Sequence, residues 1–346
     1  MSDIFKVQDD IATAVVKALK VSLLQTPRVA STASIEAYTL YLQARLIWQR
    51  KTRESELKAI DELQQALRID PRFAPAWATL AHYYVLYFAH YTDEQYQRVR
   101  RRALAAAERA IELESQLPEA HLAKALIFFN MDWDWNAANN EVTTALQLDP
   151  RSVDAIGLAA SIADVRDRHD EALELTLRPL ATDPINAQSY ATLAFEQRFF
   201  GRIGDAESNY RKALQLNPTG EGLHYGLALS AIQRGNAQTA LDELEHEPDE
   251  SFRLTGRAIA YDALGRSADA NWALAESESK YADSAFYGFV MICASRNDLD
   301  KAFYWLDRGY EKRDDGLPWA PMDYFLRNLH GDPRWQKFLR KMNLSE

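Results

Sequence analysis

The stretch that decides the fold is Ala187–Pro218, AQSYATLAFEQRFFGRIGDAESNYRKALQLNP. Two large apolar residues three positions apart, Tyr190 and Leu193, predict the face of a first helix that packs on a second. Pro218 cannot continue a helix and therefore ends the second one. Small residues stand where the two helix backbones approach closely: Ala194, Ala206 and Ala213. The stretch is therefore predicted to fold as two antiparallel helices.

A small residue is expected where the second helix comes closest to the first, and such a residue recurs along the chain. It falls at Ala59, Ala103, Ala138, Ala172, Ala206, Ala240, Ala270 and Ala302. The successive intervals are 44, 35, 34, 34, 34, 30 and 32 residues. The helix ends recur in step, at Asp70-Pro71, Glu114-Ser115, Asp149-Pro150, Asp183-Pro184 and Asn217-Pro218. The pattern predicts a linear array of helix pairs, in which each pair buries its apolar face on its neighbours.

A period of about 34 residues with these large, small and closing positions resembles the tetratricopeptide repeat, or TPR. The resemblance implies an all-α fold, a right-handed superhelical solenoid of about eight TPR-type helix pairs with N- and C-terminal capping helices. We expect residues 1–30 to form an amphipathic capping helix or linker, residues 31–312 the TPR solenoid, and residues 313–346 the C-terminal capping helices.

Two helix pairs depart from the common length. The second carries ten extra residues, since 44 exceeds 34 by ten, so either its helices are longer or a loop protrudes near Tyr91–Asp93. The third has Asp132-Trp133-Asp134-Trp135 between its helices. We expect the two indoles to wedge a longer turn onto the core, and a ligand-binding box is the alternative.

Both ends of the chain carry apolar stripes that suit caps. Residues 3–24 place apolar side chains at helical spacing: Ile4, Phe5, Ile11, Val15, Leu19 and Leu23. Near the other end, Asp332-Pro333 is a typical helix start, with proline at the first helical position. The stripe that follows it consists of Trp335, Phe338, Leu339 and Met342. An open solenoid end needs such a cover.

Three short stretches resemble the TPR portion of bacterial multidomain regulators, in which a winged-helix or nucleotide cyclase domain precedes a TolB-like segment and TPR repeats. Residues 3–12 look like the link from the TolB-like segment, and residues 35–42, IEAYTLYL, look like the opening of the first repeat. Residues 325–344 are similar to the C-terminal signature of that family. The resemblance implies a part in signalling or transcription regulation. The cyclase and DNA-binding domains have no counterpart in this sequence.

Charge and composition disfavour some classes of partner. The formal net charge is −10 and the isoelectric point is near 5.3, which disfavours direct binding of nucleic acid. One basic run, Arg98–Arg102, is split by helical geometry and is expected to be a solvated face. The single cysteine, Cys293, lies in an apolar run and is expected to be buried. We find no signal sequence and no apolar run of about 18 residues, and we expect a cytoplasmic protein that does not engage a membrane.

No catalytic motif is present: the sequence has no phosphate-binding loop, no H-E-x-x-H, no G-x-S-x-G and no G-x-G-x-x-G. We therefore expect no enzyme activity, no cofactor and no metal. His169, next to Asp167 and Asp170, is predicted to be part of a polar turn rather than a metal ligand. His246, among five acidic residues between Glu243 and Glu250, is predicted to lie at a solvated acidic helix end.

The resemblance to TPR proteins implies that the first helices line a concave groove that binds a protein or peptide. The positions that match the family's groove are His82, Leu122, Leu126, Phe129, Asn130, Phe195, Arg198, Tyr225, Leu229 and Gln233, with Val85, Ala191 and Ile232 beside them. These residues form an apolar floor with one strong donor, Arg198. An exposed apolar strip often marks an interaction surface. The Lys and Asn set with which some TPR domains hold a chaperone's carboxylate is missing, which disfavours that partner class.

The leading hypothesis is thus a protein- or peptide-binding scaffold whose partner the sequence does not identify. A small-molecule sensor, with a ligand held against Phe129, Phe195 and Tyr225, is the alternative. A homo-oligomer, formed through the N-terminal helix or the open ends of the array, is a further possibility.

Overall fold

A computed structural model describes residues 34–49, 52–87 and 93–344. The predicted helix over residues 3–24 lies outside the described residues, as does Tyr91 of the predicted loop. The described chain divides into two compact units. One contains residues 34–131 and 140–149, and the other contains residues 132–139 and 150–344.

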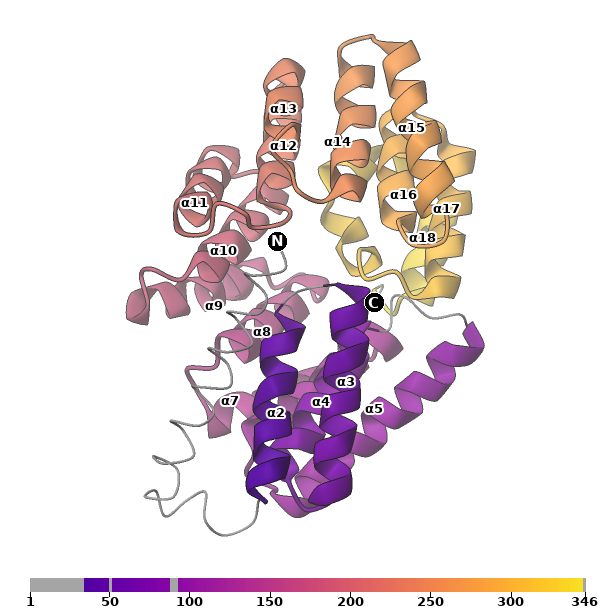
Figure 1. Cartoon of the computed structure of the whole chain (residues 1–346). Helices are drawn as coiled ribbons and strands as arrows, with labels where there is room; N and C mark the ends of the chain where they lie inside the picture. The colour runs from indigo at the N-terminus through magenta and orange to yellow at the C-terminus, as the bar shows by residue number, and fades with distance from the viewer. Residues whose placement is uncertain (1–33, 50–51, 88–92, 345–346) are drawn as a thin grey trace, which may run out of the picture. The chain divides into compact units, whose positions relative to one another are not determined.

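The first unit is built from consecutive helix pairs (Figure 1). Its helices are α2 (Ile35–Trp48), α3 (Arg53–Ile69), α4 (Ala74–Tyr87), α5 (Asp93–Leu113) and α6 (Pro118–Leu126), which continues into the π-helix η2 (Ile127–Asp132). α2 packs on α3 and α4 packs on α5, while α6 packs against α4. α5 has 21 residues against 14 in α4, so the second pair contains a long helix, which was one of the two alternatives for its extra residues.

The π-helix explains why the alanine interval that leads to the third pair is one residue longer than the common interval. A π-helix contains one residue more per turn than an α-helix needs, and such segments are uncommon. The interval between Ala103 and Ala138 is 35 residues rather than 34, and η2 lies between these two alanines. The extra residue is therefore accommodated inside the first helix of this pair.

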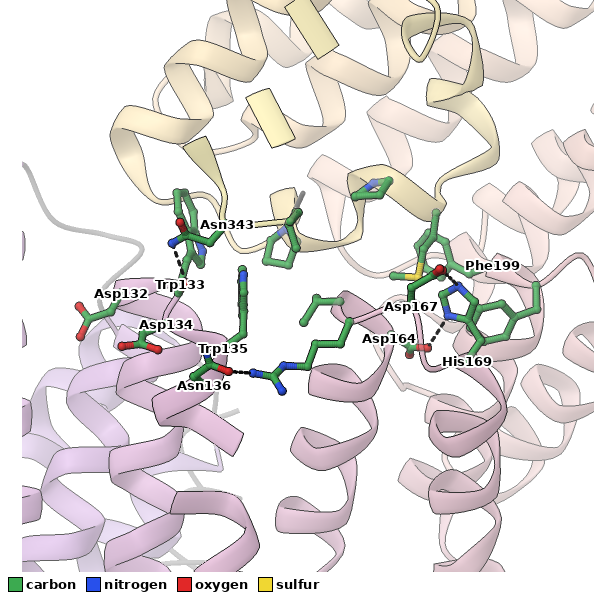
Figure 2. A pocket seen from close by; sticks show the side chains of 17 residues that line it. Asp132, Trp133, Asp134, Trp135, Asn136, Asp164, Asp167, His169, Phe199 and Asn343 are labelled. Carbon is green, nitrogen blue, oxygen red and sulfur yellow. Dashed lines mark hydrogen bonds and ion pairs between the residues drawn. The ribbon is translucent and has the colours of Figure 1, made fainter. Parts of the chain in front are cut away.

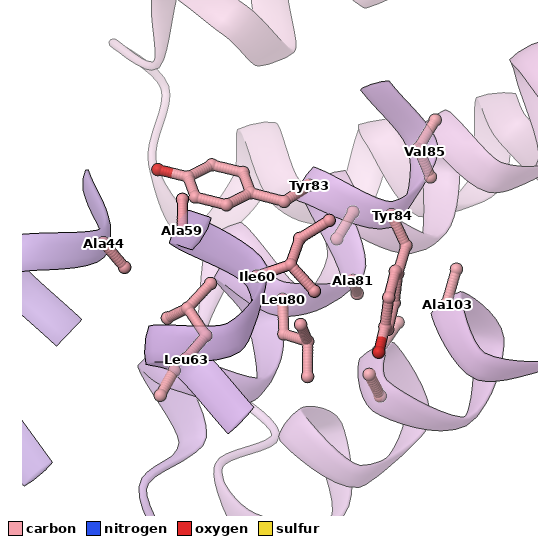
Figure 3. Packing of buried hydrophobic residues seen from close by; sticks show 14 of the residues in the cluster. Ala44, Ala59, Ile60, Leu63, Leu80, Ala81, Tyr83, Tyr84, Val85 and Ala103 are labelled. Atoms are coloured by element: carbon pink, nitrogen blue, oxygen red, sulfur yellow. The ribbon is translucent and has the colours of Figure 1, made fainter. Parts of the chain in front are cut away.

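The core of the first unit follows the alanine pattern. Ala59 of α3 and Ala103 of α5 are fully buried, and Leu63, Leu80 and Tyr84 pack around them (Figure 3). The side-chain amide of Gln64 donates a hydrogen bond to the hydroxyl of Tyr84 at 2.8 Å. Small side chains thus bring two helices together while large ones fill the space beside them.

α7 (Trp135–Leu148) begins in the second unit and ends in the first. It completes the third pair, because Glu141 of α7 contacts His121 of α6 at 2.7 Å and Lys124 of α6 at 2.8 Å. These contacts hold the pKa of the Glu141 carboxyl below its ordinary value, although burial of the side chain raises it.

The second unit is also built from helix pairs. Its helices are α8 (Val153–Val165), α9 (His169–Thr182), α10 (Ala187–Phe199), α11 (Ile203–Leu216), α12 (Leu223–Gln233), α13 (Ala237–Leu244), α14 (Glu250–Ala263), α15 (Ser267–Tyr281), α16 (Phe286–Ser295) and α17 (Leu299–Lys312). They pack in the pairs α8–α9, α10–α11, α12–α13, α14–α15 and α16–α17. The first helices also pack on one another, from α10 to α12, α14 and α16.

The predicted array of helix pairs is confirmed. The alanines at the predicted contact positions lie on the second helices α3, α5, α7, α9, α11, α13, α15 and α17, and each is fully buried. Between two successive pairs, Gly226 of α12 faces the ring of Tyr210 of α11, so closely that no side chain fits between them. Cys293 is buried in α16, as expected, and burial raises the pKa of its thiol to about 11.

The chain ends in three short elements after α17. They are the 3₁₀ helices η3 (Leu317–Met322) and η4 (Tyr324–Leu329) and the α-helix α18 (Pro333–Lys341). Asp332 caps α18 by accepting a hydrogen bond from the backbone of Arg334, so this helix starts where the sequence predicted. Trp335, Phe338 and Met342 of its stripe are buried.

Candidate binding site

The predicted groove residues of the first unit lie on α4 and on the continuous helix formed by α6 and η2. His82 is on α4, Leu122 and Leu126 are on α6, and Phe129 and Asn130 are in η2. Leu122 and Phe129 are buried, whereas His82, Leu126 and Asn130 are half-buried. The amide of Asn130 donates to the carbonyl of Leu126 at 3.2 Å. Two of the five predicted residues of this unit are therefore buried, and three are partly exposed.

The predicted groove residues of the second unit lie on α10 and α12. Phe195, Tyr225 and Gln233 are half-buried, whereas Arg198 and Leu229 are buried, with 4% and 2% of their surfaces exposed. Tyr225 stacks on Phe252 of α14 with a centroid distance of 4.9 Å.

The segment after the last repeat packs on α10 and α16. Trp319 of η3 lies edge-on to Phe195, with ring centroids 5.1 Å apart, and it also lies 6.1 Å from the ring of Phe199. Asp323 accepts a hydrogen bond from the hydroxyl of Tyr287 at 2.8 Å. The amide of Asn328 donates to a backbone carbonyl of α16 at 2.8 Å. Residues 317–329, which we call the C-terminal strap, are thus held by an aromatic contact and two polar contacts.

The charge of Arg198 is enclosed under the strap. Its guanidinium carbon is 4.3 Å from the centre of the Phe199 ring. The Nε and Nη1 atoms are buried and reach no hydrogen-bond acceptor in the part of the chain that the structure describes. Asp323, 1% exposed, supplies a nearby opposite charge. Burial and this carboxylate together raise the pKa of the Tyr287 hydroxyl well above its ordinary value.

A cavity of about 1200 Å³ lies in the second unit (Figure 2). Its wall comes from the start of α7, the α8–α9 turn, the end of α10, the strap and the chain end. The lining residues are Asp132, Trp133, Asp134, Trp135, Asn136, Asp164, Val165, Arg166, Asp167, His169, Phe199, Phe200, Pro318, Pro321, Met322, Asn343 and Leu344. A cavity of this size suits a small ligand or a side chain with part of its peptide.

His169 stands between two carboxylates in this cavity. One ring nitrogen contacts Asp164 at 3.2 Å and the other contacts Asp167 at 2.8 Å (Figure 2). Phe200 lies against the imidazole, with centroids 4.5 Å apart. His169 and Asp167 lie at the predicted polar turn between α8 and α9. Asp164, which the prediction did not include, joins them and has a fully buried side chain.

Behind Asp164 lies a second buried carboxyl group, Glu196 of α10. Each residue is 2% exposed, and the two carboxyl groups are close enough to share a proton. Burial raises the pKa of both groups, and the neighbouring Asp164 raises that of Glu196 further, well above its ordinary value. Both shifts favour the protonated form of the carboxyl groups, most strongly for Glu196.

Trp133 and Trp135 join the start of α7 to the end of the chain. The indole of Trp135 donates to the carbonyl of Met342 at 3.0 Å, and the amide of Asn343 donates to the carbonyl of Trp133 at 3.3 Å. Arg313 lies 4.3 Å from the centre of the Trp133 ring. Both indoles are buried, so the packing role expected for them is confirmed. The buried Nε1 of Trp133 has no acceptor among the described residues.

One prediction about the acidic run near His246 is wrong for Glu247. This residue is 1% exposed rather than solvated. Its carboxylate accepts hydrogen bonds from the backbone N–H groups of Gly222 and Tyr225, both at 3.0 Å. Glu247 therefore caps the start of α12, where N–H groups lack partners within the helix.

Sequence reasoning assigned residues 313–346 to capping helices but did not predict that the strap covers first helices, and it missed the carboxyl pair. The strap follows the last repeat, where the repeat pattern has no more positions to assign. Asp164 and Glu196 lie on different helices, and neither has a spacing signal that links it to the other. The indole pair and the His169–Asp167 turn were the features of the sequence analysis that lie at the cavity.

Comparison with known proteins supports the helix-pair architecture. No protein-family model matches the sequence, and no curated protein matches it. Human IFIT1, in the structure of its dimer with m7Gppp-AAAA, is similar with a TM-score of 0.61 and 14% identity, over 88% of this chain and 72% of that one. A tetratricopeptide repeat protein from Parabacteroides merdae ATCC 43184 is similar with a TM-score of 0.50 and 14% identity, over 71% of this chain and 93% of that one. The chain therefore has the fold of tetratricopeptide repeat proteins.

Proposed function

We propose that the chain is a protein- or peptide-binding TPR scaffold. One observation supports this most strongly: the first helices of the second unit already hold a peptide-like segment, the C-terminal strap. An aromatic anchor, Trp319, is packed between side chains of α10, and Asp323 and Asn328 are held by α16. The same helix faces suit a partner with an aromatic residue followed by acidic and amide side chains.

The surface we propose for the partner is the predicted groove set. Half-buried side chains on the first helices, Leu126 in the first unit and Phe195 in the second, leave apolar surface for a partner to cover. Arg198 is buried. In this proposal its guanidinium orients the rings of Phe195 and Phe199 and places a positive charge beneath the surface. The half-buried His82, Asn130, Tyr225 and Gln233 supply polar groups at the edge of the apolar surface.

The finer role that we propose is the regulatory or interaction part of a bacterial signalling or transcription-regulating system. This rests on the likeness of residues 3–12, 35–42 and 325–344 to TolB-like regulators. We further propose a cytoplasmic setting, a protein rather than nucleic-acid partner, and no catalytic activity. In the described residues, no helix is both long and apolar enough to cross a membrane.

Affinity capture with matched variants tests the scaffold. Leu126→Ala and Phe195→Ala shorten side chains on first helices, whereas Leu57→Ala and Trp272→Ala shorten side chains that are 48% and 55% exposed on second helices. We expect the first pair to lose a partner that the wild type and the second pair retain. Circular dichroism confirms that each variant is folded. Equal capture by all four variants would exclude the first-helix surface as the binding site.

A small-molecule sensor is the second candidate, and the cavity of about 1200 Å³ favours it. A ligand at 100 times its dissociation constant stabilises the folded protein by about 2.7 kcal/mol. A thermal-shift screen with metabolites therefore separates the two roles. A ligand that raises the melting temperature of Phe195→Ala as much as that of the wild type binds outside the groove.

A further inference from the structure

A second cavity in the second unit, with a volume of about 620 Å³, lies where three first helices end. Its walls come from the last turns of α12, α14 and α16, from the turn after α16, and from η4 of the strap. Its floor is apolar and consists of the buried Ile259, Ala294 and Phe325 and the half-buried Ile232. The floor therefore suits an aliphatic or aromatic side chain of a ligand.

The rim of this cavity carries an open positive charge. Of the lining residues that the structure describes, Asp262 is the one acid and Arg327 the one base. Asp262 is already paired with the guanidinium of Arg296, which lies outside the lining. Arg327 is exposed, and its guanidinium carbon lies 5.0 Å from the centre of the Tyr324 ring. No carboxylate in the described part of the chain forms an ion pair with Arg327.

Asn297 offers a second donor at the same rim. The side-chain amide of Asn328 donates to the backbone carbonyl of Ala294 at 2.8 Å and to the side-chain oxygen of Asn297 at 3.1 Å. The NH₂ group of Asn297 is left without an acceptor in the ranges that the structure describes. A guanidinium and an amide NH₂ match a group that accepts hydrogen bonds and carries a single negative charge, as a carboxylate does.

The cavity is open, which favours a polypeptide over a small molecule as its occupant. Six of its eleven lining residues are exposed. Small-molecule sites typically enclose about 70–90% of the surface of the ligand. A trough that leaves one side of its occupant in solvent suits a chain segment that crosses it, with one side chain on the floor and the next at the rim.

We propose that this cavity binds an acidic polypeptide segment, in which a Glu or Asp side chain accepts hydrogen bonds from Arg327 and Asn297 and a neighbouring aliphatic side chain lies on the apolar floor. The inference rests on the proposed function, because it names the chemistry of a polypeptide that binds the first helices. Leu126 and Phe195, which test the proposed function, do not line this cavity, so the two proposals fail in distinguishable ways.

Isothermal titration calorimetry on the full chain tests the proposal with four probes. They are the peptide acetyl-Ala-Leu-Glu-Leu-Ala-amide, the same peptide with glutamine in place of glutamate, the same peptide with serine in place of both leucines, and hexanoate. We expect the glutamate peptide to bind about tenfold more tightly than the glutamine peptide, the effect of one charge-assisted hydrogen bond. The net charge of −10 makes the chain as a whole repel an acidic peptide, so this preference has to come from a local cation.

Three variants locate the preference for glutamate. Arg327→Gln should abolish it, whereas Arg340→Gln, which removes an exposed arginine of α18 outside the cavity, should leave it unchanged. Asn297→Asp replaces the amide donor by a carboxylate and should make the glutamine peptide the tighter ligand. Asn297 has a backbone φ of 57°, a conformation that aspartate also adopts, so this variant retains its turn and its acceptor for Asn328.

The proposal is overturned if no peptide binds at millimolar concentration, if the glutamate and glutamine peptides bind equally, or if Arg340→Gln abolishes the preference as Arg327→Gln does. Equal binding of the serine peptide would exclude the apolar floor from the site. Hexanoate that binds as tightly as the glutamate peptide would overturn a polypeptide as the occupant. Loss of a captured partner in Phe195→Ala, together with equal binding of the glutamate and glutamine peptides, would overturn this inference and leave the proposed function standing.

Discussion

The contact between Gly226 of α12 and Tyr210 of α11 sets the spacing between neighbouring repeats. A Cβ atom added at Gly226 would lie 2.3 Å from Cζ of Tyr210 and 2.6 Å and 2.8 Å from two further ring carbons. Ordinary carbon contacts are about 3.5–4.0 Å. Because Tyr210 is 4% exposed and enclosed by the core, its ring cannot swing aside, and the helices must move apart.

The expected change in the free energy of unfolding for Gly226→Ala follows from two opposing effects. Overpacking a buried contact costs about 1–3 kcal/mol, and a contact this short belongs at the upper end of that range. Replacing glycine by alanine inside a helix contributes about 1 kcal/mol in the other direction. We therefore expect Gly226→Ala to lower the free energy of unfolding by about 2 kcal/mol.

Gly157→Ala in α8 isolates the second effect, because a Cβ atom there meets nothing within 4 Å. This control should stabilise the protein by about 0.5–1 kcal/mol. Urea unfolding followed by circular dichroism gives both values from the shift in midpoint. A Gly226→Ala variant as stable as Gly157→Ala would refute the close approach of the two helices.

Three further outcomes follow from the described contacts. The pKa of the Glu196 carboxyl is raised in the folded state, so the folded protein holds this proton more tightly than the unfolded chain does. Wild-type stability should therefore fall as the pH rises above the ordinary value of 4.5. Glu196→Gln should show a flatter profile of urea midpoints against pH, and a profile parallel to that of the wild type would count against the carboxyl pair. Cys293, buried and with its thiol pKa raised to about 11, should react with a thiol reagent such as DTNB only when denaturant is added, and rapid reaction of the native protein would place it at the surface. Trp319→Ala removes the aromatic anchor of the strap and should destabilise the protein by about 2–3 kcal/mol. Limited proteolysis should then cut within residues 317–329. An unchanged cleavage pattern would show that Trp319 does not anchor the strap.

The repeat architecture was predictable because its signal is local and repeated. An alanine such as Ala206 can be assigned to a helix contact from its neighbours in sequence, and the same pattern returns along the chain. The π-helix η2 is the exception, because an interval of 35 residues between Ala103 and Ala138 shows an insertion but not where the helix absorbs it.

The candidate sites were less accessible to sequence reasoning because they depend on how distant segments meet. Arg198 matches a groove position of the repeat family, but its burial depends on Trp319 and Asp323, which follow the last repeat. The cavity likewise combines Asp164, Phe199 and Pro318, whose separation in sequence hides their contact. No repeat pattern extends to the segment that brings them together, so only the structure could show it.

Site-specific photo-crosslinking in the source cells tests most directly whether the first-helix surface is the binding site. A photoreactive phenylalanine analogue is placed at Leu126 and at Phe195 on first helices, and at Leu57 and at Trp272 on second helices. The scaffold proposal predicts a discrete protein adduct at the first-helix positions and none at the second-helix positions. Adducts confined to Leu57 or Trp272, or no adduct at any of the four positions, would contradict it.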